Sequence, residues 1–309
     1  MNINVVFMGT PDFAVPILET LIKNTNVKLV VTQPDAYVGR KKVLTPSPVK
    51  KKALENNIPV FQPVKIRTDF EIIKKYNPDL IVTCAYGQIV PKDVLDIPHL
   101  GCINVHASIL PKYRGGAPIH HAIINGEKET GITIMYMDEG MDTGDIIKIA
   151  KIPILDTDNV ESMHDKLSNL GAALLEEVLP SIISGTNERI KQIDSEATYA
   201  KVIKREDEHL DFNTKALNIF NKVRGLNSWP LANLMLDNEE IKVIEGYIGE
   251  DTNIEPGTIV KVLKDAIGIS CEDKIYYITK IKPFGKKAML VRDYLNGVNK
   301  ESLLNKRVK

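Results

Sequence analysis

The chain of 309 residues has 40 Lys and Arg residues against 40 Asp and Glu residues, so its formal net charge is zero and its total charge indicates no polyanionic partner. Its content of 43% hydrophobic and 26% charged residues is typical of a globular protein. No run approaches the roughly 18 uncharged apolar residues that a membrane span requires. Because a single hydrophobic core rarely grows beyond about 250–300 residues, this length favours two domains.

The cysteines and the N-terminus favour a reducing, cytoplasmic location. Cys84, Cys102 and Cys271 show no C-x-x-C spacing, which argues against a zinc site or a disulfide framework. Residues 1–13 have no basic leader and have the composition of a first strand, so we expect no signal peptide. We also expect no bound metal, no membrane association and a monomer.

The first 189 residues are expected to form one α/β domain. Five apolar runs have the composition of strands, at 3–8, 28–33, 79–86, 102–107 and 132–138. Helical spacing of apolar residues predicts helices at 13–24, 48–56, 68–76 and 118–125, with a long helix within 158–184. Continuous apolar strands separated by helices predict a parallel sheet that helices cover on both faces.

The pattern changes after residue 189. Segment 190–206 is polar and weakly periodic, which indicates a linker. A helix at about 213–224 then precedes short strand-like runs separated by turns, at 231–237, 240–248, 257–263, 267–271 and 274–281. This succession predicts a small β-barrel domain over 207–309. The final segment, 274–309, carries ten Lys or Arg residues against two acidic residues.

Two polar side chains interrupt the apolar run 102–107. Side chains alternate across a strand, so Asn104 and His106 lie on the same face, near the carboxyl end where open parallel sheets bind their ligands. One interpretation is a buried polar pair satisfied by backbone groups. The other is catalytic, because a neutral amide donor beside an imidazole suits the oxyanion of an acyl transfer.

A carboxylate that could orient the imidazole is expected in segment 137–146. It contains Asp138, Asp142 and Asp145. Because the segment follows another predicted strand, we expect its loop to emerge at the same edge of the sheet. Position alone does not choose among the three aspartates, and each of them could instead close an Asx turn or cap a helix.

These motifs together resemble the folate-dependent formyltransferase family. The matching runs are NVHASILPKYRGGAP at 104–118 and ETGITIMYMDEGMDTGDI at 129–146. The resemblance implies that Asn104, His106 and Asp142 are the catalytic trio and that 10-formyltetrahydrofolate is the formyl donor. It also implies that the folate contacts come from Ser108, Ile109, Leu110, Pro111, Tyr86, Gly87, Gln88, Ile89 and Asp138.

Three further segments resemble the members of this family that formylate methionyl initiator tRNA. They are 6–16, the basic loop 32–53 and VRGLNSWPLA at 223–232. The resemblance implies a Rossmann-like catalytic domain, a C-terminal barrel of oligonucleotide-binding type, and transfer of formyl to the α-amino group of the methionine. It also implies tRNA contacts by Arg40, Lys41 and Lys42, although the GRKK loop is shorter than the family pattern.

Other functions fit the sequence less well. The roughly 100-residue extension disfavours a glycinamide ribonucleotide formyltransferase, and the basic loop disfavours a sugar-nucleotide formyltransferase. A dinucleotide-binding protein would need G-x-G-x-x-G where this chain has GTPDFA. A metal hydrolase would use His120 and His121, but neighbouring helix residues diverge by about 100°. A non-catalytic RNA-binding protein is the alternative if the trio does not assemble.

Overall fold

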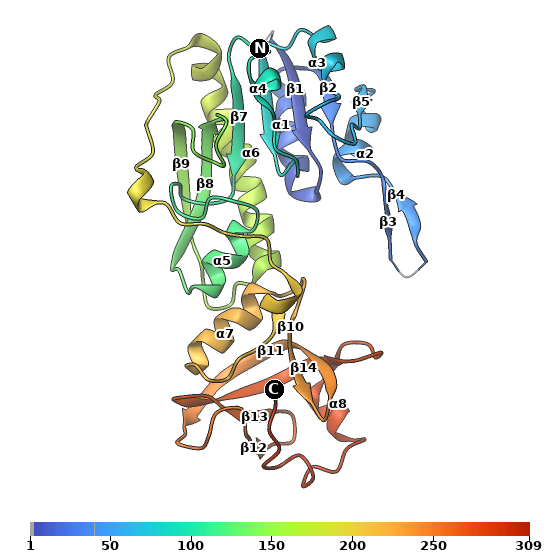
Figure 1. The fold of residues 1–309 in the computed structure, drawn as a ribbon, viewed down its shortest axis with the longest axis vertical. Helices are drawn as coiled ribbons and strands as arrows, with labels where there is room; N and C mark the ends of the chain where they lie inside the picture. The colour runs from blue at the N-terminus through green and yellow to red at the C-terminus, as the bar shows by residue number, and fades with distance from the viewer. Residues whose placement is uncertain (1–2, 40) are drawn as a thin grey trace. The chain divides into compact units, whose positions relative to one another are not determined.

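The computed structural model describes residues 3–39 and 41–309. The chain forms two compact units, whose elements are labelled in Figure 1. The first unit contains the chain up to Gly116, Glu129–Ile152 and His164–Ala200, and the second contains Ala117–Lys128, Pro153–Met163 and Lys201–Lys309. The predicted linker 190–206 is therefore divided, because its first part, through Ala200, is built into the first unit.

A seven-stranded sheet with the order β5-β2-β1-β6-β7-β8-β9 forms the centre of the first unit. Its strands are β1 (Asn4–Gly9), β2 (Asn26–Val31), β5 (Val60–Phe61), β6 (Leu80–Cys84), β7 (Cys102–His106), β8 (Glu129–Tyr136) and β9 (Ile146–Pro153). The predicted parallel sheet is confirmed for β5, β2, β1, β6 and β7. It is wrong for β8, which runs antiparallel to β7, with Thr133 opposite His106 and Tyr136 opposite Ile103.

Helices pack on this sheet because their apolar residues recur on one side. They are α1 (Val15–Asn24), preceded by the short turn η1 (Asp12–Ala14), α2 (Pro48–Glu55), α3 (Glu71–Lys75), α4 (Lys92–Leu95) and α6 (Val160–Ser184). In α1 the buried residues Ile17, Leu18 and Leu21 follow the helical period. Helix α2 begins at Ser47, whose hydroxyl accepts a hydrogen bond from Lys50 N at 3.0 Å.

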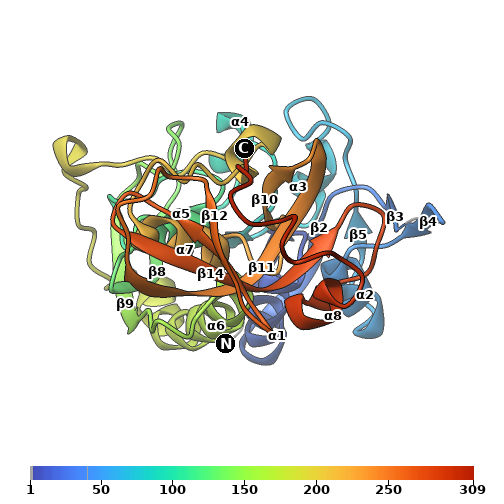
Figure 2. The same cartoon turned by 90° about the horizontal axis from the view of Figure 1, so that it is seen from below.

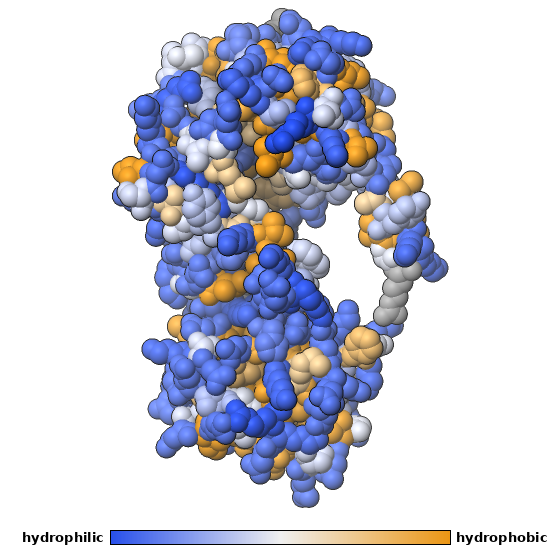
Figure 3. Space-filling view, viewed as in Figure 1, coloured by the Kyte–Doolittle hydropathy of each residue, from blue (hydrophilic) through white to orange (hydrophobic). Residues whose placement is uncertain are grey.

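A two-stranded hairpin occupies the basic loop that follows β2. Strands β3 (Ala36–Val38) and β4 (Val43–Thr45) pair antiparallel, and Figures 1 and 2 both show them standing away from the seven-stranded sheet. Their exposed residues include several hydrophobic ones, visible as orange atoms on this arm in Figure 3. The base of the hairpin is held by Lys50, whose Nζ lies 2.8 Å from both carboxylate oxygens of Asp35.

The second unit is built on a six-stranded antiparallel sheet, which confirms the β-rich C-terminal domain. Its strands are β10 (Ala232–Leu236), β11 (Glu239–Asp251), β12 (Ile259–Val262), β13 (Ile267–Ser270), β14 (Lys274–Pro283) and β15 (Met289–Leu290). Its helices are α5 (Pro118–Ile124), η3 (Arg205–Glu208), α7 (Ala216–Gly225) and α8 (Val291–Leu295), and the short turn η2 (Asp194–Glu196) belongs to the first unit.

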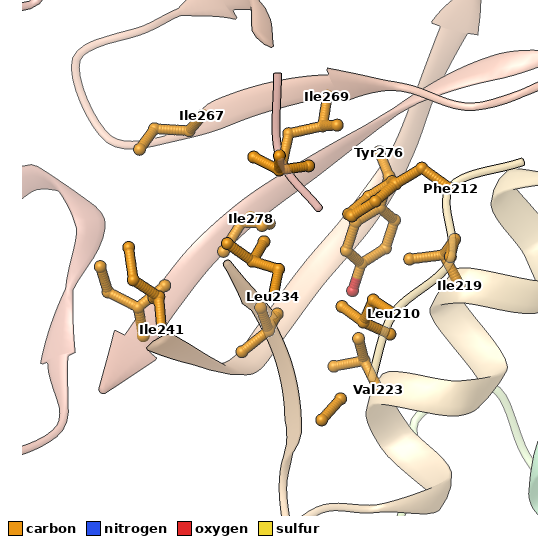
Figure 4. Close-up of a cluster of buried hydrophobic side chains, with 14 of the residues drawn as sticks. Leu210, Phe212, Ile219, Val223, Leu234, Ile241, Ile267, Ile269, Tyr276 and Ile278 are labelled. Atoms are coloured by element: carbon orange, nitrogen blue, oxygen red, sulfur yellow. The ribbon is translucent and has the colours of Figure 1, made fainter. Parts of the chain in front are cut away.

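The core of the second unit forms between α7 and the sheet. Figure 4 shows Ile219 and Val223 of α7 beside the ring of Tyr276, with Leu234 and Ile278 contributed by strands. Tyr276 is fully buried, and its hydroxyl has no hydrogen-bond partner among the described residues. Burial accordingly raises the pKa of this phenol.

None of the helices in the described ranges combines the length and the hydropathy that a bilayer-crossing helix needs.

Candidate active site

Asn104 and His106 lie in β7 at alternate positions, and therefore on one face of the strand, near its carboxyl end as predicted. In the neighbouring strand β6, Thr83 lies opposite Asn104, and its hydroxyl donates to Asn104 Oδ1 at 2.9 Å. That bond uses the carbonyl side of the amide and leaves the NH₂ group, which donates to no described residue. The β6–β7 register therefore orients Asn104 so that its donor atoms remain available.

His106 is buried and is held by one of its two nitrogens. Nε2 lies 3.0 Å from the backbone oxygen of Tyr113, and because a carbonyl only accepts, Nε2 carries a hydrogen. Nδ1 lies 3.7 Å from Asp142 Oδ2. The ring is thus held through Nε2, and Nδ1 lies near the Asp142 carboxylate but beyond hydrogen-bond distance.

The structure distinguishes the three aspartates of the loop that follows β8. Asp138 Oδ1 accepts a hydrogen bond from Gly140 N at 3.0 Å and so closes a local turn. Asp145 pairs with Arg189 Nε at 3.1 Å, and the guanidinium lies 4.0 Å from the centre of the Tyr136 ring. Of the three aspartates, it is Asp142 that lies beside His106.

The expected origin of this loop is wrong, although its arrival at His106 is as predicted. Because β8 is antiparallel to β7, the loop leaves the sheet beside the amino end of β7, where Met137 N donates to Cys102 O at 2.8 Å. Asp142 reaches the site with a left-handed backbone (φ 54°), and its Oδ2 accepts from Gly115 N at 2.8 Å. The RGG turn after β7 therefore supplies the anchor for the carboxylate.

The turn Ser108–Pro111 is held by hydrogen bonds to Lys112 and to Thr133 of β8. Ser108 Oγ donates to Lys112 O at 2.7 Å, and Thr133 Oγ1 donates to Ser108 O at 2.6 Å. Ser108 and Leu110 are buried, whereas Ile109 and Pro111 are partly exposed. The side chains of this turn that reach the surface are thus those of Ile109 and Pro111.

In the segment after β6, as in the turn Ser108–Pro111, some of the predicted folate contacts are buried and others are exposed. The Tyr86 side chain is buried in the core of the first unit, its hydroxyl has no partner among the described residues, and burial raises its pKa. Gln88 is held by Ile66 N, which donates to its Oε1 at 2.9 Å. Of the four predicted folate contacts in this segment, Gly87 and Ile89 are the exposed ones.

A cavity of about 910 Å³ lies beside residues 136–140, where the loop that carries Asp142 begins. Its lining includes Asp138, Tyr136 and Arg189. It does not include the trio Asn104, His106 and Asp142. Only Asp138 of the predicted folate contacts faces it. The converging polar groups, and not this cavity, therefore define the candidate active site.

The two adjacent histidines serve backbone contacts. His120 Nε2 lies 3.3 Å from Trp229 O, and His121 Nε2 lies 2.9 Å from Lys201 O. Within residues 3–39 and 41–309, no three His, Cys, Asp or Glu side chains are placed so that they could hold a metal ion.

Two of the three predicted tRNA contacts lie on the hairpin. Lys41 and Lys42 are exposed at its tip, and Arg40 lies outside the described residues. Sequence reasoning missed the hairpin itself and also Thr83, which orients Asn104. A threonine inside the otherwise apolar run LIVTC was the available signal for Thr83.

An open α/β sheet that gathers an amide, an imidazole and a carboxylate near the end of β7 defines an enzyme of group transfer. The formyl transferase family matches residues 1–179, and the formyl transferase C-terminal domain matches residues 202–299. The chain therefore belongs to the formyl transferase family.

Its relatives identify the branch of the family. The methionyl-tRNA formyltransferase of Staphylococcus epidermidis is 51% identical over 305 residues, covering 98% of each chain. That of Staphylococcus aureus is 50% identical over 308 residues, covering 98% of this chain and 99% of the relative. The similarity to methionyl-tRNA formyltransferases thus extends over both units.

Solved structures share the fold at low identity. A methionyl-tRNA formyltransferase from Clostridium thermocellum matches 80% of this chain and 94% of its own, with a TM-score of 0.56 at 19% identity. The sugar 3N-formyl transferase WlaRD, solved in the presence of dTDP and 5-N-formyl-THF, matches 92% of this chain and 99% of its own, with a TM-score of 0.65 at 21% identity.

Proposed function

We propose that the enzyme transfers the formyl group of 10-formyltetrahydrofolate to the α-amino group of methionine esterified to initiator tRNA. The observation that carries the proposal is the convergence of Asn104, His106 and Asp142, with 3.7 Å between His106 Nδ1 and Asp142 Oδ2. The identity of about half of all residues to methionyl-tRNA formyltransferases supports the acceptor.

The residues around the trio fit a flat donor with one polar reacting group. Formyl transferases use formyl-tetrahydrofolate, which supplies a formyl carbon that an amine can attack. The exposed side chains Ile89 and Met141 lie on the loops after β6 and β8 and offer apolar surface to the pterin. Backbone groups of the two loops and of the turn Ser108–Pro111 would make the polar contacts.

Asn104 and His106 stabilise the negative charge that develops on the formyl oxygen. The free NH₂ of Asn104 donates one hydrogen bond. The Nδ1–H of protonated His106 donates a second, because Nδ1 lies 3.7 Å from Asp142 Oδ2 and is not hydrogen-bonded to it. Each such donor typically contributes about 10²–10³ in rate. Both groups are oriented before the reaction, by Thr83 and by the Tyr113 carbonyl, so little reorganisation is needed.

Asp142 supports the charged imidazole and accepts the proton that the attacking amine loses, directly or through water. When the tetrahedral intermediate collapses, the bond between the formyl carbon and N10 of the folate breaks and N10 takes up this proton, so tetrahydrofolate leaves as a neutral amine. The substrate brings its own nucleophile, so the chain needs none. The hydroxyl of Ser108 donates to the Lys112 carbonyl and has no base beside it, which agrees with direct attack by the amine.

Contacts with tRNA come from two basic surfaces. The hairpin tip carries Lys41 and Lys42, which follow Arg40 in the sequence. The turn between β14 and β15 carries Lys286 and Lys287 close in sequence to Phe284, and Lys282 lies near the end of β14. Phe284 is 80% exposed, and an exposed ring among cations suits stacking on an RNA base. Cationic contacts with phosphates make the Michaelis constant for tRNA depend on salt.

The decisive experiment incubates the enzyme with labelled formyl-tetrahydrofolate and a panel of aminoacylated tRNAs. We expect label on methionyl initiator tRNA and none on methionyl elongator tRNA. A dTDP-aminosugar in the same assay tests the sugar-nucleotide alternative, and label on that sugar alone would overturn the proposed acceptor. Light scattering of the same preparation tests the expected monomer, and fractionation of cells tests the expected cytoplasmic location.

A further inference from the structure

The side chain of Gln192 holds the loop that carries Asp142 through two hydrogen bonds. Gln192 Nε2 donates to Asp142 O and to Gly144 O, both at 2.8 Å. Gln192 lies about 50 residues further along the chain, in the segment expected to be a linker. One amide thus spans the turn around Thr143 and fixes the backbone of Asp142 itself.

The orientation of this amide is set by a buried arginine. Arg114 donates from Nε at 3.1 Å and from Nη2 at 2.8 Å to Gln192 Oε1. A guanidinium has no acceptor, so it requires the oxygen side of the amide and directs the NH₂ toward the loop. Arg114 is 2% exposed and also pairs with Asp194 Oδ1 at 2.8 Å, so its buried charge is compensated.

The same stretch of chain holds the carboxylate. Gly115, next to Arg114, donates its N–H to Asp142 Oδ2 at 2.8 Å. Gly115 has φ +115°, and a Cβ there would lie 2.7 Å from Ala200 O, so the position needs glycine. Arg114 N in turn donates to Thr198 O at 2.9 Å. Asp142 is therefore held at two points, its backbone by Gln192 and its side chain by Gly115.

We propose that Gln192 and Arg114 are positioning residues for the formyl transfer, which set the direction of the Asp142 carboxylate toward His106. Neither residue touches the reacting groups in this arrangement, and both act through the loop. The inference rests on the proposed role of Asp142. A displacement of about 1 Å at a reacting group can cost roughly 100-fold in rate.

The test is a double-mutant cycle that combines Gln192→Met with Asp142→Asn. Methionine removes both hydrogen bonds to the loop at similar side-chain volume. If Gln192 acts through Asp142, we expect Gln192→Met to lower kcat by about 10- to 100-fold in the wild-type background and by less than about twofold beside Asp142→Asn. The Michaelis constant for formyl-tetrahydrofolate should change little in either background.

Two further variants keep the test decisive. Gln192→Glu retains the pairing with Arg114 but removes the donors, so it should behave like Gln192→Met, and it replaces that variant if the methionine form does not fold. Ser195→Glu adds the same charge three residues further along, at an exposed position in η2, and should retain wild-type kcat.

Equal fold-losses in both backgrounds, or no loss in either, would overturn the inference. Full activity of Asp142→Asn alone would instead overturn the proposed role of Asp142, so the two failures are distinguishable.

Discussion

Each polar residue of the active site is oriented by a partner that has no chemical role. Thr83 turns the amide of Asn104, the Tyr113 carbonyl fixes one nitrogen of His106, and a backbone N–H holds Asp142. Donors that are already aimed cost no reorganisation when charge develops, which is the main source of electrostatic catalysis. The geometry of the site therefore depends on Thr83, Tyr113 and Gly115 as much as on the trio itself.

At this scale we predict the effect of Asp142→Asn. The amide keeps the shape and can still accept from Gly115, but the side chain loses the negative charge beside His106 and the group that we propose takes the proton. We expect kcat to fall by about 10²- to 10⁴-fold while folate affinity changes little. The matched control is Asp145→Asn in the same loop, where the carboxylate pairs with Arg189 and not with His106. Turnover of Asp142→Asn equal to that of the control would contradict the assignment.

Two local elements carry the features that a strand-and-helix prediction does not contain. The hairpin places its tip lysines away from the sheet, and its base is fastened by Asp35, whose carboxyl pKa is lowered chiefly by the hydrogen bond from Lys50. In the second unit, the antiparallel strands close over α7 and bury Tyr276 (Figure 4). The hairpin is the element that we propose for tRNA contact, and the core of the second unit provides stability.

For the hairpin we predict that Lys41→Glu combined with Lys42→Glu raises the Michaelis constant for tRNA by roughly tenfold and flattens its salt dependence. Folate binding should stay unchanged. The double variant Lys65→Glu and Lys75→Glu makes the same change in net charge at exposed positions outside the hairpin, and should leave the constant near wild type. If both double variants weaken tRNA equally, the effect is one of total charge and not of the hairpin.

For the C-terminal core we predict opposite signs for two adjacent tyrosines. Tyr276→Phe removes a buried hydroxyl without a described partner and should raise the free energy of unfolding by about 1 kcal/mol. Tyr277→Phe removes a hydroxyl that donates to Glu250 Oε1 at 3.0 Å and should lower it by about 0.5–1.5 kcal/mol. Urea unfolding followed by the fluorescence of the single tryptophan, Trp229, measures both. A loss of stability in Tyr276→Phe would show that its hydroxyl is satisfied.

On the scale of the whole molecule, the chain does not divide into two consecutive halves. Segments Ala117–Lys128 and Pro153–Met163 leave the first unit and join the second, so the second unit contains a helix, α5, from the middle of the catalytic sequence. This helix packs against α7, where Gly225 admits Ile124: a Cβ at Gly225 would lie 2.6 Å from Ile124 Cγ1. The stability of the second unit therefore depends on α5, which lies about a hundred positions before α7 in the sequence.

His120 on α5 makes the stability of the second unit depend on pH. Burial lowers its pKa below the usual value near 6.5, which the hydrogen bond to the Trp229 carbonyl offsets in part and the neighbouring His121 reinforces. Because the unfolded chain binds the proton more readily, the contribution of neutral His120 is complete above about pH 6.5 and is lost as the pH falls through the folded pKa. We expect acidification from pH 7.5 to 5 to destabilise wild type more than His120→Gln in urea unfolding. Equal losses in the two proteins would contradict this assignment.

Much of the site could be predicted from the sequence because its signals are local. The alternation of β7 places Asn104 and His106 on one face, and the motifs around them carry the family resemblance. Composition and periodicity likewise indicated an α/β first half and a β-rich second half. These features depend on residues that are neighbours along the chain, where backbone geometry alone relates the side chains.

Only the tertiary structure decided how distant segments meet. It reversed β8, so the loop that carries Asp142 begins at the other edge of the sheet, and it built the first part of the expected linker into the catalytic unit, where Gln192 reaches that loop. Such contacts join residues tens of positions apart. Strand direction and loop path depend on which packing buries the most apolar surface while satisfying the backbone, and no short stretch of sequence contains that information.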